Sequence, residues 1–222
     1  MIASSRTTSI SWRLDAGESR AGASRRVARH IVKHAKVVLD FWFGAPGAPE
    51  YGKSRAVWFK KDDAFDAEIA LRFGAAQRAA AAGRYDSWQT SPKGALALTV
   101  LLDQFPRNMY RGTPAAFACD SHAQRIARNA VARGFDRDLL PVERWFVYLP
   151  FEHAEDRASQ CKSLQLFATL RNDPGSAGNM DYARRHYEIV ARFGRFPHRN
   201  AILGRESTPE EIEFLKQPGS GF

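Results

Sequence analysis

The sequence predicts an all-α fold of about eight helices in antiparallel pairs, forming a single domain over residues 31–222. Apolar residues recur at helical spacing, as in Phe65, Ile69 and Phe73, which lie four residues apart. Serine or threonine followed by proline marks several helix starts, because the hydroxyl caps the helix and proline suits its first turn. No stretch shows the alternation of polar and apolar residues that is typical of a half-buried strand.

The N-terminal helices are expected to bring aromatic side chains into the core. Residues 28–42 form the first helix, and Gly44 opens the loop behind it. A short helix around residues 54–59 turns Trp58 and Phe59 inward. Core packing is favoured over an exposed stacking surface for these rings, because large aromatic side chains dominate helical cores.

Two helices follow in the middle of the chain. A long helix spans residues 63–82 and stops at Gly83. The next helix starts at Ser91 and Pro92 and runs to residue 104. It is apolar nearly all round, which predicts burial on every side and a central position in the fold.

The C-terminal half repeats the same signals of helix start and helix end. Thr113 and Pro114 begin a helix that closes at Gly134. Pro141 begins another helix, which is broken at Pro150. The remaining expected helices lie at residues 154–171, at residues 177–193 and from Thr208-Pro209 onward.

The basic charge of the chain is concentrated near its N-terminus. The net charge is +9, but residues 1–36 hold eight basic and two acidic residues, and the other 25 basic residues face 22 acidic ones. A nearly balanced body argues against nucleic-acid binding, which needs a basic face. Residues 1–30 are rich in Ser, Arg, Ala and Gly, and we expect a disordered basic tail or a start site placed too far upstream.

The apolar runs and the cysteines predict a cytoplasmic protein without a membrane partner. The longest apolar run, Ala95 to Leu102, is far shorter than the roughly 18 residues of a membrane helix. Cys119 and Cys161 lie on apolar helical stripes and lack the spacing of a metal site. We interpret them as small buried side chains in a reducing compartment, in preference to reactive or bridged thiols. The oligomeric state stays open.

A short polar phrase occurs twice, as Phe105-Pro106-Arg107-Asn108 and as Phe196-Pro197-His198-Arg199-Asn200. Each copy follows a helical segment, and its proline is expected to stop that helix. An arginine and an asparagine then stand side by side on a loop. Because a guanidinium group matches a carboxylate or a phosphate with two parallel hydrogen bonds, the two phrases predict an anion site.

Asp103 is the strongest local anomaly in the sequence. It is expected at the C-terminal end of an apolar helix, where the helix dipole disfavours a carboxylate. Arg107 and Arg199 are its natural partners, although a buried structural ion pair would explain the same residues. The candidate ligand-binding residues are Asp103, Gln104, Arg107, Asn108, His186, Arg195, Arg199 and Asn200.

An acidic cluster with a histidine lies between the two phrases and suggests acid–base chemistry. The candidate catalytic residues are Glu152, His153, Asp156 and His198, with the carboxylates orienting a histidine. The plainer interpretation of His153 is a satisfied residue in a helical turn. The histidine spacings match no metal-site pattern, and the chain has no glycine-rich phosphate loop, nucleophile elbow or thiol–histidine signature. No metal and no cofactor are expected.

Six stretches of the chain carry a family resemblance, at residues 38–44, 58–62, 94–98, 101–114, 149–156 and 192–200, and the last three are the most specific. They resemble a family of uncharacterised bacterial proteins, domain-of-unknown-function family 924, and the resemblance extends from about residue 37 to the end of the chain. It implies an all-helical fold similar to tetratricopeptide-repeat proteins, a right-handed superhelix of antiparallel helix pairs, and no established activity. Ala154 stands where relatives are expected to have serine, so any role of that hydroxyl is absent here.

Three hypotheses about function follow. The favoured one is a helical protein whose polar groove binds an anionic small molecule, or a protein or peptide partner through a carboxylate. The second is a hydrolase-type enzyme that uses His153 or His198 with Glu152 or Asp156. The third is a purely structural role for the polar residues. Binding is favoured over catalysis because no recognisable nucleophile or metal set is present.

Overall fold

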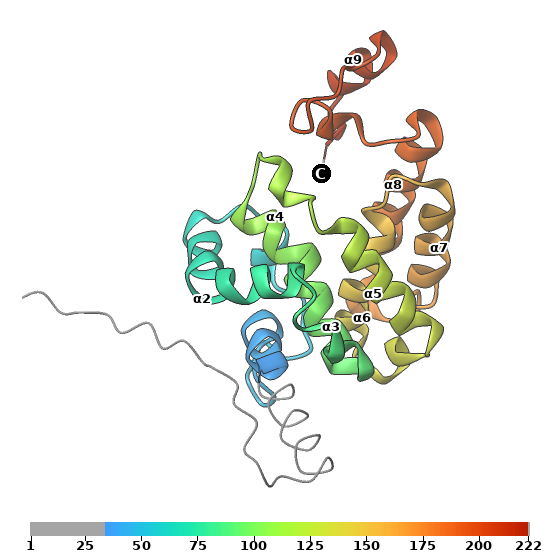
Figure 1. Cartoon of the computed structure of the whole chain (residues 1–222). Coiled ribbons are helices and arrows are strands. Elements are labelled where there is room, and N and C mark those ends of the chain that lie inside the picture. The colour runs from blue at the N-terminus through green and yellow to red at the C-terminus, as the bar shows by residue number, and fades with distance from the viewer. Residues whose placement is uncertain (1–33, 222) are drawn as a thin grey trace, which may run out of the picture.

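The structure is a computed structural model that describes residues 34–221, and all the regular secondary structure of this part of the chain is helical, without strands (Figure 1). The prediction of an all-α fold with about eight helices is confirmed. Residues 34–43 are helical, and the α-helices that follow are α2 (Asp63–Ala81), α3 (Pro92–Thr99), α4 (Phe105–Met109), α5 (Asp120–Ala132), α6 (Pro141–Glu152), α7 (Arg157–Ala168), α8 (Asn179–Phe193) and α9 (Pro209–Leu215).

Short helical turns connect these helices. A π-helical turn, η3 (Val100–Gln104), joins α3 to α4. The turns of 3₁₀-helix are η1 (Ala56–Trp58), η2 (Asp86–Thr90), η4 (Pro114–Ala116), η5 (Phe135–Asp138), η6 (Pro174–Ser176) and η7 (Pro197–Arg199). The expected tail at residues 1–30 and the start of the first helix lie outside the described residues. The right-handed superhelix of helix pairs stays a prediction.

Helix α3 lies at the centre of the fold. The helices α5, α6, α7 and α8 pack against one another in chain order, α3 packs against α5 and α6, and α2 packs against α4 on the other side (Figure 1). Every residue from Gly94 to Thr99 is buried, as the apolar run predicts. The C-terminal segment with α9 projects from one end of this arrangement. Among the described residues, no helix has the length and the apolar character needed to cross a membrane.

The aromatic residues near the N-terminus pack in the core, with one exception. Trp42 and Trp58 stack at 5.9 Å, and the Trp58 ring lies 4.8 Å from that of Phe146. The prediction that Phe59 turns inward is wrong, because its side chain is 63% exposed. The short helix here is only three residues long, and it ends at Trp58, one residue before Phe59.

The prediction that Pro106 stops the central helix is wrong. The helical backbone continues from Pro92 to Met109, because η3 widens one turn and α4 begins at once with Pro106 in its first turn, where no N–H is needed. The Phe105 N–H donates to the Val100 carbonyl five residues back. Asp103 therefore lies inside a continuous buried helix and not at its end, so burial, and not the end of the helix dipole, sets its environment.

Two further helix boundaries differ from the prediction. Pro150 does not break α6, because α6 continues to Glu152 with Leu149, Pro150 and Phe151 all buried in the core. Thr113 and Pro114 begin only the short turn η4, and α5 starts later, at Asp120. Pro150 was expected to break a helix and Pro114 to begin one, and in both places tertiary packing outweighs this local preference.

Two predicted boundaries are confirmed, because α2 ends at Ala81, just before Gly83, and α9 starts with Thr208 as its cap. The helix expected at residues 154–171 is shorter at both ends, since α7 spans Arg157–Ala168. The prediction that Pro197 stops α8 is wrong, because α8 already ends with Gly194 in the left-handed conformation.

The two cysteines are free and half-buried. Burial and the neighbouring Asp120 raise the pKa of Cys119, which keeps its thiol protonated. This environment agrees with the interpretation of Cys119 as an unreactive thiol.

Gly94 marks a close approach between α3 and η2, and we expect its replacement by alanine to destabilise the fold. A Cβ atom at Gly94 would lie 2.1 Å from the carbonyl oxygen of Trp88. Gly94→Ala should therefore cost about 1–3 kcal/mol or more of unfolding free energy in urea denaturation. Gly74→Ala in α2 is the matched control, because its Cβ would meet only flexible side-chain ends, Nη1 of Arg78 at 3.4 Å and Sδ of Met109 at 4.0 Å, and it should be neutral or stabilising. Equal stability of the two variants would contradict the prediction.

Candidate functional site

Five charged or titratable side chains, each from a different element of the fold, meet at one place, and we call them the polar cluster. They are Asp103, Arg107, Asp120, His153 and Arg199. They come from η3, α4, the first residue of α5, the end of α6 and η7. The two copies of the polar phrase therefore meet through their arginines, as the sequence predicts.

Asp103 forms the buried floor of the polar cluster. Its Oδ1 accepts a hydrogen bond from Nδ1 of His153 at 2.8 Å and lies 3.2 Å from Nη1 of Arg107. Its Oδ2 accepts from Nε2 of Gln104 at 2.5 Å. The π-helical turn holds Asp103 and Gln104 in this position, and such turns occur often at functional sites.

Arg107 joins the floor of the polar cluster to its rim. Its Nη1 and Nη2 donate to the two carboxylate oxygens of Asp120 at 2.8 and 2.9 Å. Nη1 also donates to the backbone carbonyl of Asp103 at 2.8 Å. The sequence reasoning missed Asp120. Its only signal was an acidic residue close to a predicted helix start, which is common for structural reasons alone.

Arg199 is held between two aromatic rings. The centre of its guanidinium group lies 4.7 Å from the ring of Phe117 and 4.5 Å from the ring of Phe196. Its Nη1 donates to the carbonyl of His153 at 3.0 Å and lies 3.5 Å from Asp120. Its Nε is buried and has no hydrogen-bond partner in the described part of the chain.

The charges of the polar cluster balance at neutral pH. Burial would raise the pKa of Asp103, but Arg107 and His153 outweigh it and hold that pKa well below its usual range. Burial and the charge of Arg107 lower the pKa of His153, so its imidazole is neutral. Burial and the charge of Arg107 also lower the pKa of Arg199 to about 10. Two guanidinium groups therefore face two carboxylates, with a neutral histidine between them.

A second buried pair lies behind the polar cluster. Nδ1 of His186 is 3.2 Å from Oε1 of Glu152 and 2.9 Å from the carbonyl of Tyr182. The rings of His153 and His186 are 6.3 Å apart. Burial and the nearby Asp103 raise the pKa of Glu152 to about 8, and burial and His153 lower that of His186 to about 3. Both groups are therefore neutral near pH 7.

The two asparagines of the phrases do not join the polar cluster. Asn108 donates to Asp66 on α2 at 2.7 Å. Asn200 donates to Glu211 at 3.2 Å, and Arg195 forms two hydrogen bonds of 2.7 and 2.8 Å with the same carboxylate. These three predicted ligand-binding residues therefore fasten neighbouring segments to one another.

The predicted catalytic carboxylates also lie in places other than those expected. Asp156 caps α7 by accepting from the N–H of Ser159, and Glu152 faces His186. The carboxylate that orients His153 is Asp103, fifty residues away in the sequence. His198 packs beside the Phe196 ring at 5.6 Å, and burial and Arg199 lower its pKa to about 4.

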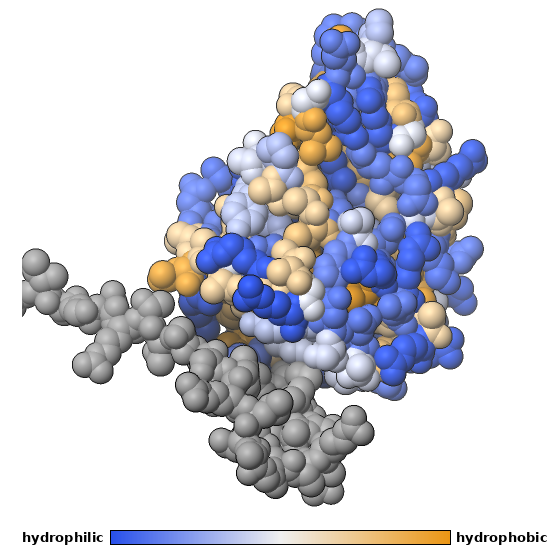
Figure 2. Space-filling view, viewed as in Figure 1, coloured by the Kyte–Doolittle hydropathy of each residue, from blue (hydrophilic) through white to orange (hydrophobic). Residues whose placement is uncertain are grey.

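The polar cluster has a closed floor and a partly open rim. The side chains of Asp103 and Arg199 are 1% and 7% exposed, whereas those of His153, Arg107 and Asp120 are 14%, 18% and 22% exposed. Figure 2 shows hydrophobic residues in a strip between the side of the molecule that carries α4 and the projecting C-terminal segment. Within the polar cluster, Arg107 of α4 and Arg199 of η7 meet at Asp120.

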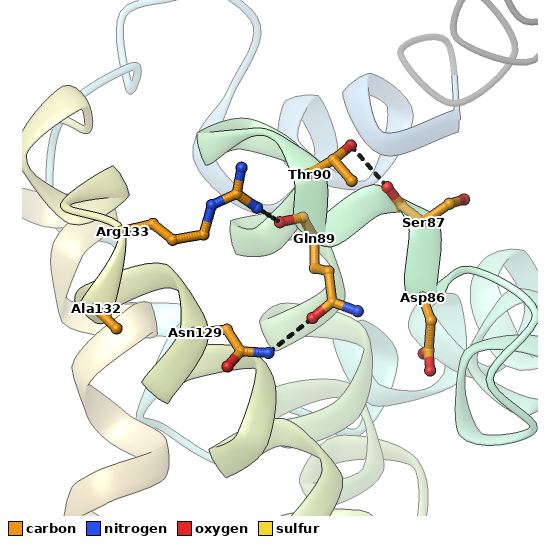
Figure 3. Close-up of a pocket in the computed structure, with 7 residues that line it drawn as sticks. All are labelled: Asp86, Ser87, Gln89, Thr90, Asn129, Ala132 and Arg133. Atoms are coloured by element: carbon orange, nitrogen blue, oxygen red, sulfur yellow. Dashed lines mark hydrogen bonds between the residues drawn. The ribbon is translucent and has the colours of Figure 1, made fainter.

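Two surface pockets lie away from the polar cluster. One of about 520 Å³ lies between η2 and α5, and its polar walls are bonded to each other, because Arg133 and Asn129 both donate to Gln89 (Figure 3). Another of about 490 Å³ lies beside residues 34–43 and α2. Within residues 34–221, no group of three or more His, Cys, Asp or Glu side chains has the arrangement of a metal site.

Comparison with known proteins gives two matches without a known activity. The profile of a family described as bacterial protein of unknown function (DUF924) matches residues 38–219. A solved structure of a protein of unknown function from Agrobacterium tumefaciens is 42% identical in sequence and superposes with a TM-score of 0.74. The match covers 83% of this chain and 98% of the other. No match was found among curated proteins.

Proposed function

This chain belongs to the DUF924 family of bacterial proteins of unknown function, and we propose that it binds an anionic molecule through a carboxylate at Arg199. The observation that carries the proposal is the buried Nε–H of Arg199, which has no acceptor among the described residues. A buried donor on a charged group costs free energy when it is left without a partner. A carboxylate oxygen of a ligand would supply the missing acceptor.

The geometry of Arg199 favours a carboxylate. Its Nη1 is already bonded to the carbonyl of His153, which leaves the edge formed by Nε and Nη2. That edge presents two parallel N–H groups, the pattern that matches a carboxylate with two hydrogen bonds. Contacts with the rings of Phe117 and Phe196 restrict the guanidinium group before binding, so little conformational entropy is lost when a ligand binds.

The surrounding charges support the same proposal. Arg107 and Arg199 share one carboxylate, Asp120, while Asp103 lies underneath with His153 and Arg107. The repulsion from Arg107 contributes to the lowered pKa of Arg199, and a bound anion would relieve it. A purely structural network accounts for Arg107, whose donors meet carboxylates directly, but leaves the Nε of Arg199 unexplained.

Titration calorimetry of the full chain tests this proposal. The probes are acetate, succinate, citrate and inorganic phosphate, together with a short peptide that carries either a free or an amidated C-terminus. Binding of the small carboxylates identifies a small-molecule site, whereas binding of only the free-acid peptide identifies a peptide partner. If the protein binds inorganic phosphate more tightly than the carboxylates, the ligand group at Arg199 is a phosphate and not a carboxylate.

We expect Arg199→Met to weaken this binding at least tenfold, which corresponds to about 1.4 kcal/mol, because the variant keeps the stacking volume and loses the donors. Arg199→Lys should also fail, since an ammonium group cannot reproduce the fork. Arg111→Met is the control, because Arg111 is bonded to Asp66 outside the polar cluster. Wild-type protein that is folded and binds none of the probes, or equal binding by Arg199→Met, would refute the proposal.

A further inference from the structure

His153 has the geometry of a general base. Its Nδ1 donates to the buried carboxylate of Asp103 at 2.8 Å, and Gln104 and Arg107 hold that carboxylate in place. This hydrogen bond fixes the tautomer with the proton on Nδ1, so the lone pair is on Nε2. Nε2 forms no hydrogen bond with the described residues, and the side chain reaches the partly open rim.

A donor for a developing negative charge lies next to this base. The guanidinium group of Arg199 is bonded to the backbone carbonyl of His153 itself, and its Nε–H is buried without an acceptor. The imidazole base of His153 and the charged Nε–H donor of Arg199 therefore belong to one site. No serine, threonine or cysteine in the described residues is hydrogen-bonded to His153, so none of these side chains is placed as a nucleophile for this base.

We propose that His153 activates a water molecule for the hydrolysis of a carboxylic ester whose carbonyl oxygen is bound by Nε–H of Arg199. This inference rests on the proposed function, because the carboxylate that Arg199 binds is then the product of the reaction. In the ester, the carbonyl oxygen takes the place of one oxygen of that carboxylate. The proposal requires the acyl carbon to lie within reach of a water molecule on Nε2 of His153, whose backbone carbonyl is bonded to the same guanidinium group.

The reaction balances with water as the only co-reactant. The water oxygen bonds to the acyl carbon while one of its protons moves to Nε2 of His153, and the carbonyl electron pair moves to the oxygen, where Nε–H of Arg199 stabilises it. The carbonyl then re-forms, the bond from carbon to the leaving oxygen breaks, and that oxygen takes the proton from His153. Asp103 stays ionised throughout and stabilises the imidazolium between the two steps.

The electrostatic surroundings of His153 suit the activation of a water molecule better than the removal of a proton from a carbon atom. The groups that face it are Asp103, Arg107, Asp120 and His186. Burial and Arg107 lower the pKa of His153. The neutral, basic form of His153 is therefore present at pH 7, but it is a weak base. A weak base can accept the proton of a water molecule while that water attacks an activated acyl carbon.

Hydrolysis of p-nitrophenyl acetate, butyrate and monosuccinate by the full chain tests the inference. We expect His153→Gln to lower kcat/KM at least about 100-fold, because general base catalysis contributes factors of that size. Glutamine keeps a donor for Asp103, and circular dichroism establishes that the variant is folded. His122→Gln is the matched control, because His122 forms a similar pair with Asp86 at 3.0 Å outside the polar cluster, and it should retain full activity.

Two further variants separate chemistry from structure. Arg199→Met should lower kcat/KM through a second, independent group. Asp103→Asn tests a positioning residue: it should change the pH profile of kcat/KM as well as its height, because Asp103 supports the protonated form of His153. A uniform loss at every pH would indicate a structural effect alone and would count against the orientation of His153 by Asp103.

The outcomes distinguish this inference from the proposed function. Binding of acetate or butyrate without hydrolysis of any ester keeps the anion site and overturns the catalytic inference. Hydrolysis that His153→Gln retains also overturns it. Hydrolysis that depends on His153 but not on Arg199, without measurable binding of the carboxylate products, refutes the proposed binding function and the assignment of the ester carbonyl to Arg199, and leaves only the role of His153 as the base.

Discussion

Arg107→Met is expected to lower the unfolding free energy by about 3–5 kcal/mol, the cost of leaving a buried charge without its partner. Asp103 is buried completely, and Arg107 is its charged neighbour at 3.2 Å. The same guanidinium group forms two hydrogen bonds with Asp120. Methionine fills a similar volume but leaves Asp103 with only His153 and Gln104.

Urea denaturation of three arginine variants checks this expectation. Arg107→Met should lose the full amount, whereas Arg111→Met, at a half-exposed ion pair, should lose about 1 kcal/mol or less. Arg199→Met should lose much less than Arg107→Met, because its donors are partly unused and the repulsion from Arg107 disappears. Equal losses for Arg107→Met and Arg199→Met would show that both arginines are structural and would weaken the case for a ligand.

A double variant identifies the source of the loss. In Asp103→Asn/Arg107→Met the charge that Arg107 compensates is gone, so the double variant should be more stable than Arg107→Met alone. If the loss of unfolding free energy in the double variant equals the sum of the losses in the two single variants, then the loss in Arg107→Met comes from packing and not from charge.

The sequence predicted the all-helical fold and the convergence of the two arginines for identifiable physical reasons. Apolar spacing and capping residues are local, so α2, α3 and α9 could be placed from the residues alone. Asp103 stood out because a carboxylate at the expected end of an apolar helix needs a partner, and Arg107 follows only four residues later in the sequence. The partnership required no knowledge of the tertiary structure.

The rest of the polar cluster depends on contacts that local signals cannot predict. His153 and Asp103 are fifty residues apart, so the sequence favoured the adjacent Glu152 and Asp156 as partners of the histidine. The π-helical turn was hidden, because it differs from an α-helix by one residue in the hydrogen-bond pattern and not in its apolar periodicity. Asn108 and Asn200 are corresponding residues of the two phrases, but they contact different segments. Of the corresponding pairs in the two phrases, the arginines meet at one site and the asparagines do not.

Glu152 is expected to make the stability of the fold depend on pH in the direction opposite to a carboxyl group whose pKa is lowered on folding. Its pKa is raised from 4.5 to about 8, first by burial and then by the charge of Asp103. Between these two values the folded state holds a proton that the unfolded state releases. The stability that Glu152 contributes is therefore fully present below about pH 4.5 and is lost as the pH rises through about 8.

Glu152→Gln removes this dependence, because the amide stays neutral in both states. The unfolding free energy of the variant minus that of the wild type should therefore rise by about 4 kcal/mol between pH 5 and pH 9, three pKa units at about 1.4 kcal/mol each. The comparison at each pH cancels the titration of the histidines. Glu155→Gln is the control, because Arg205 holds the pKa of Glu155 below its usual range despite partial burial, so its difference from wild type should stay constant over this interval. A flat difference for Glu152→Gln would show that Glu152 is ionised in the folded protein and forms a charged pair with His186.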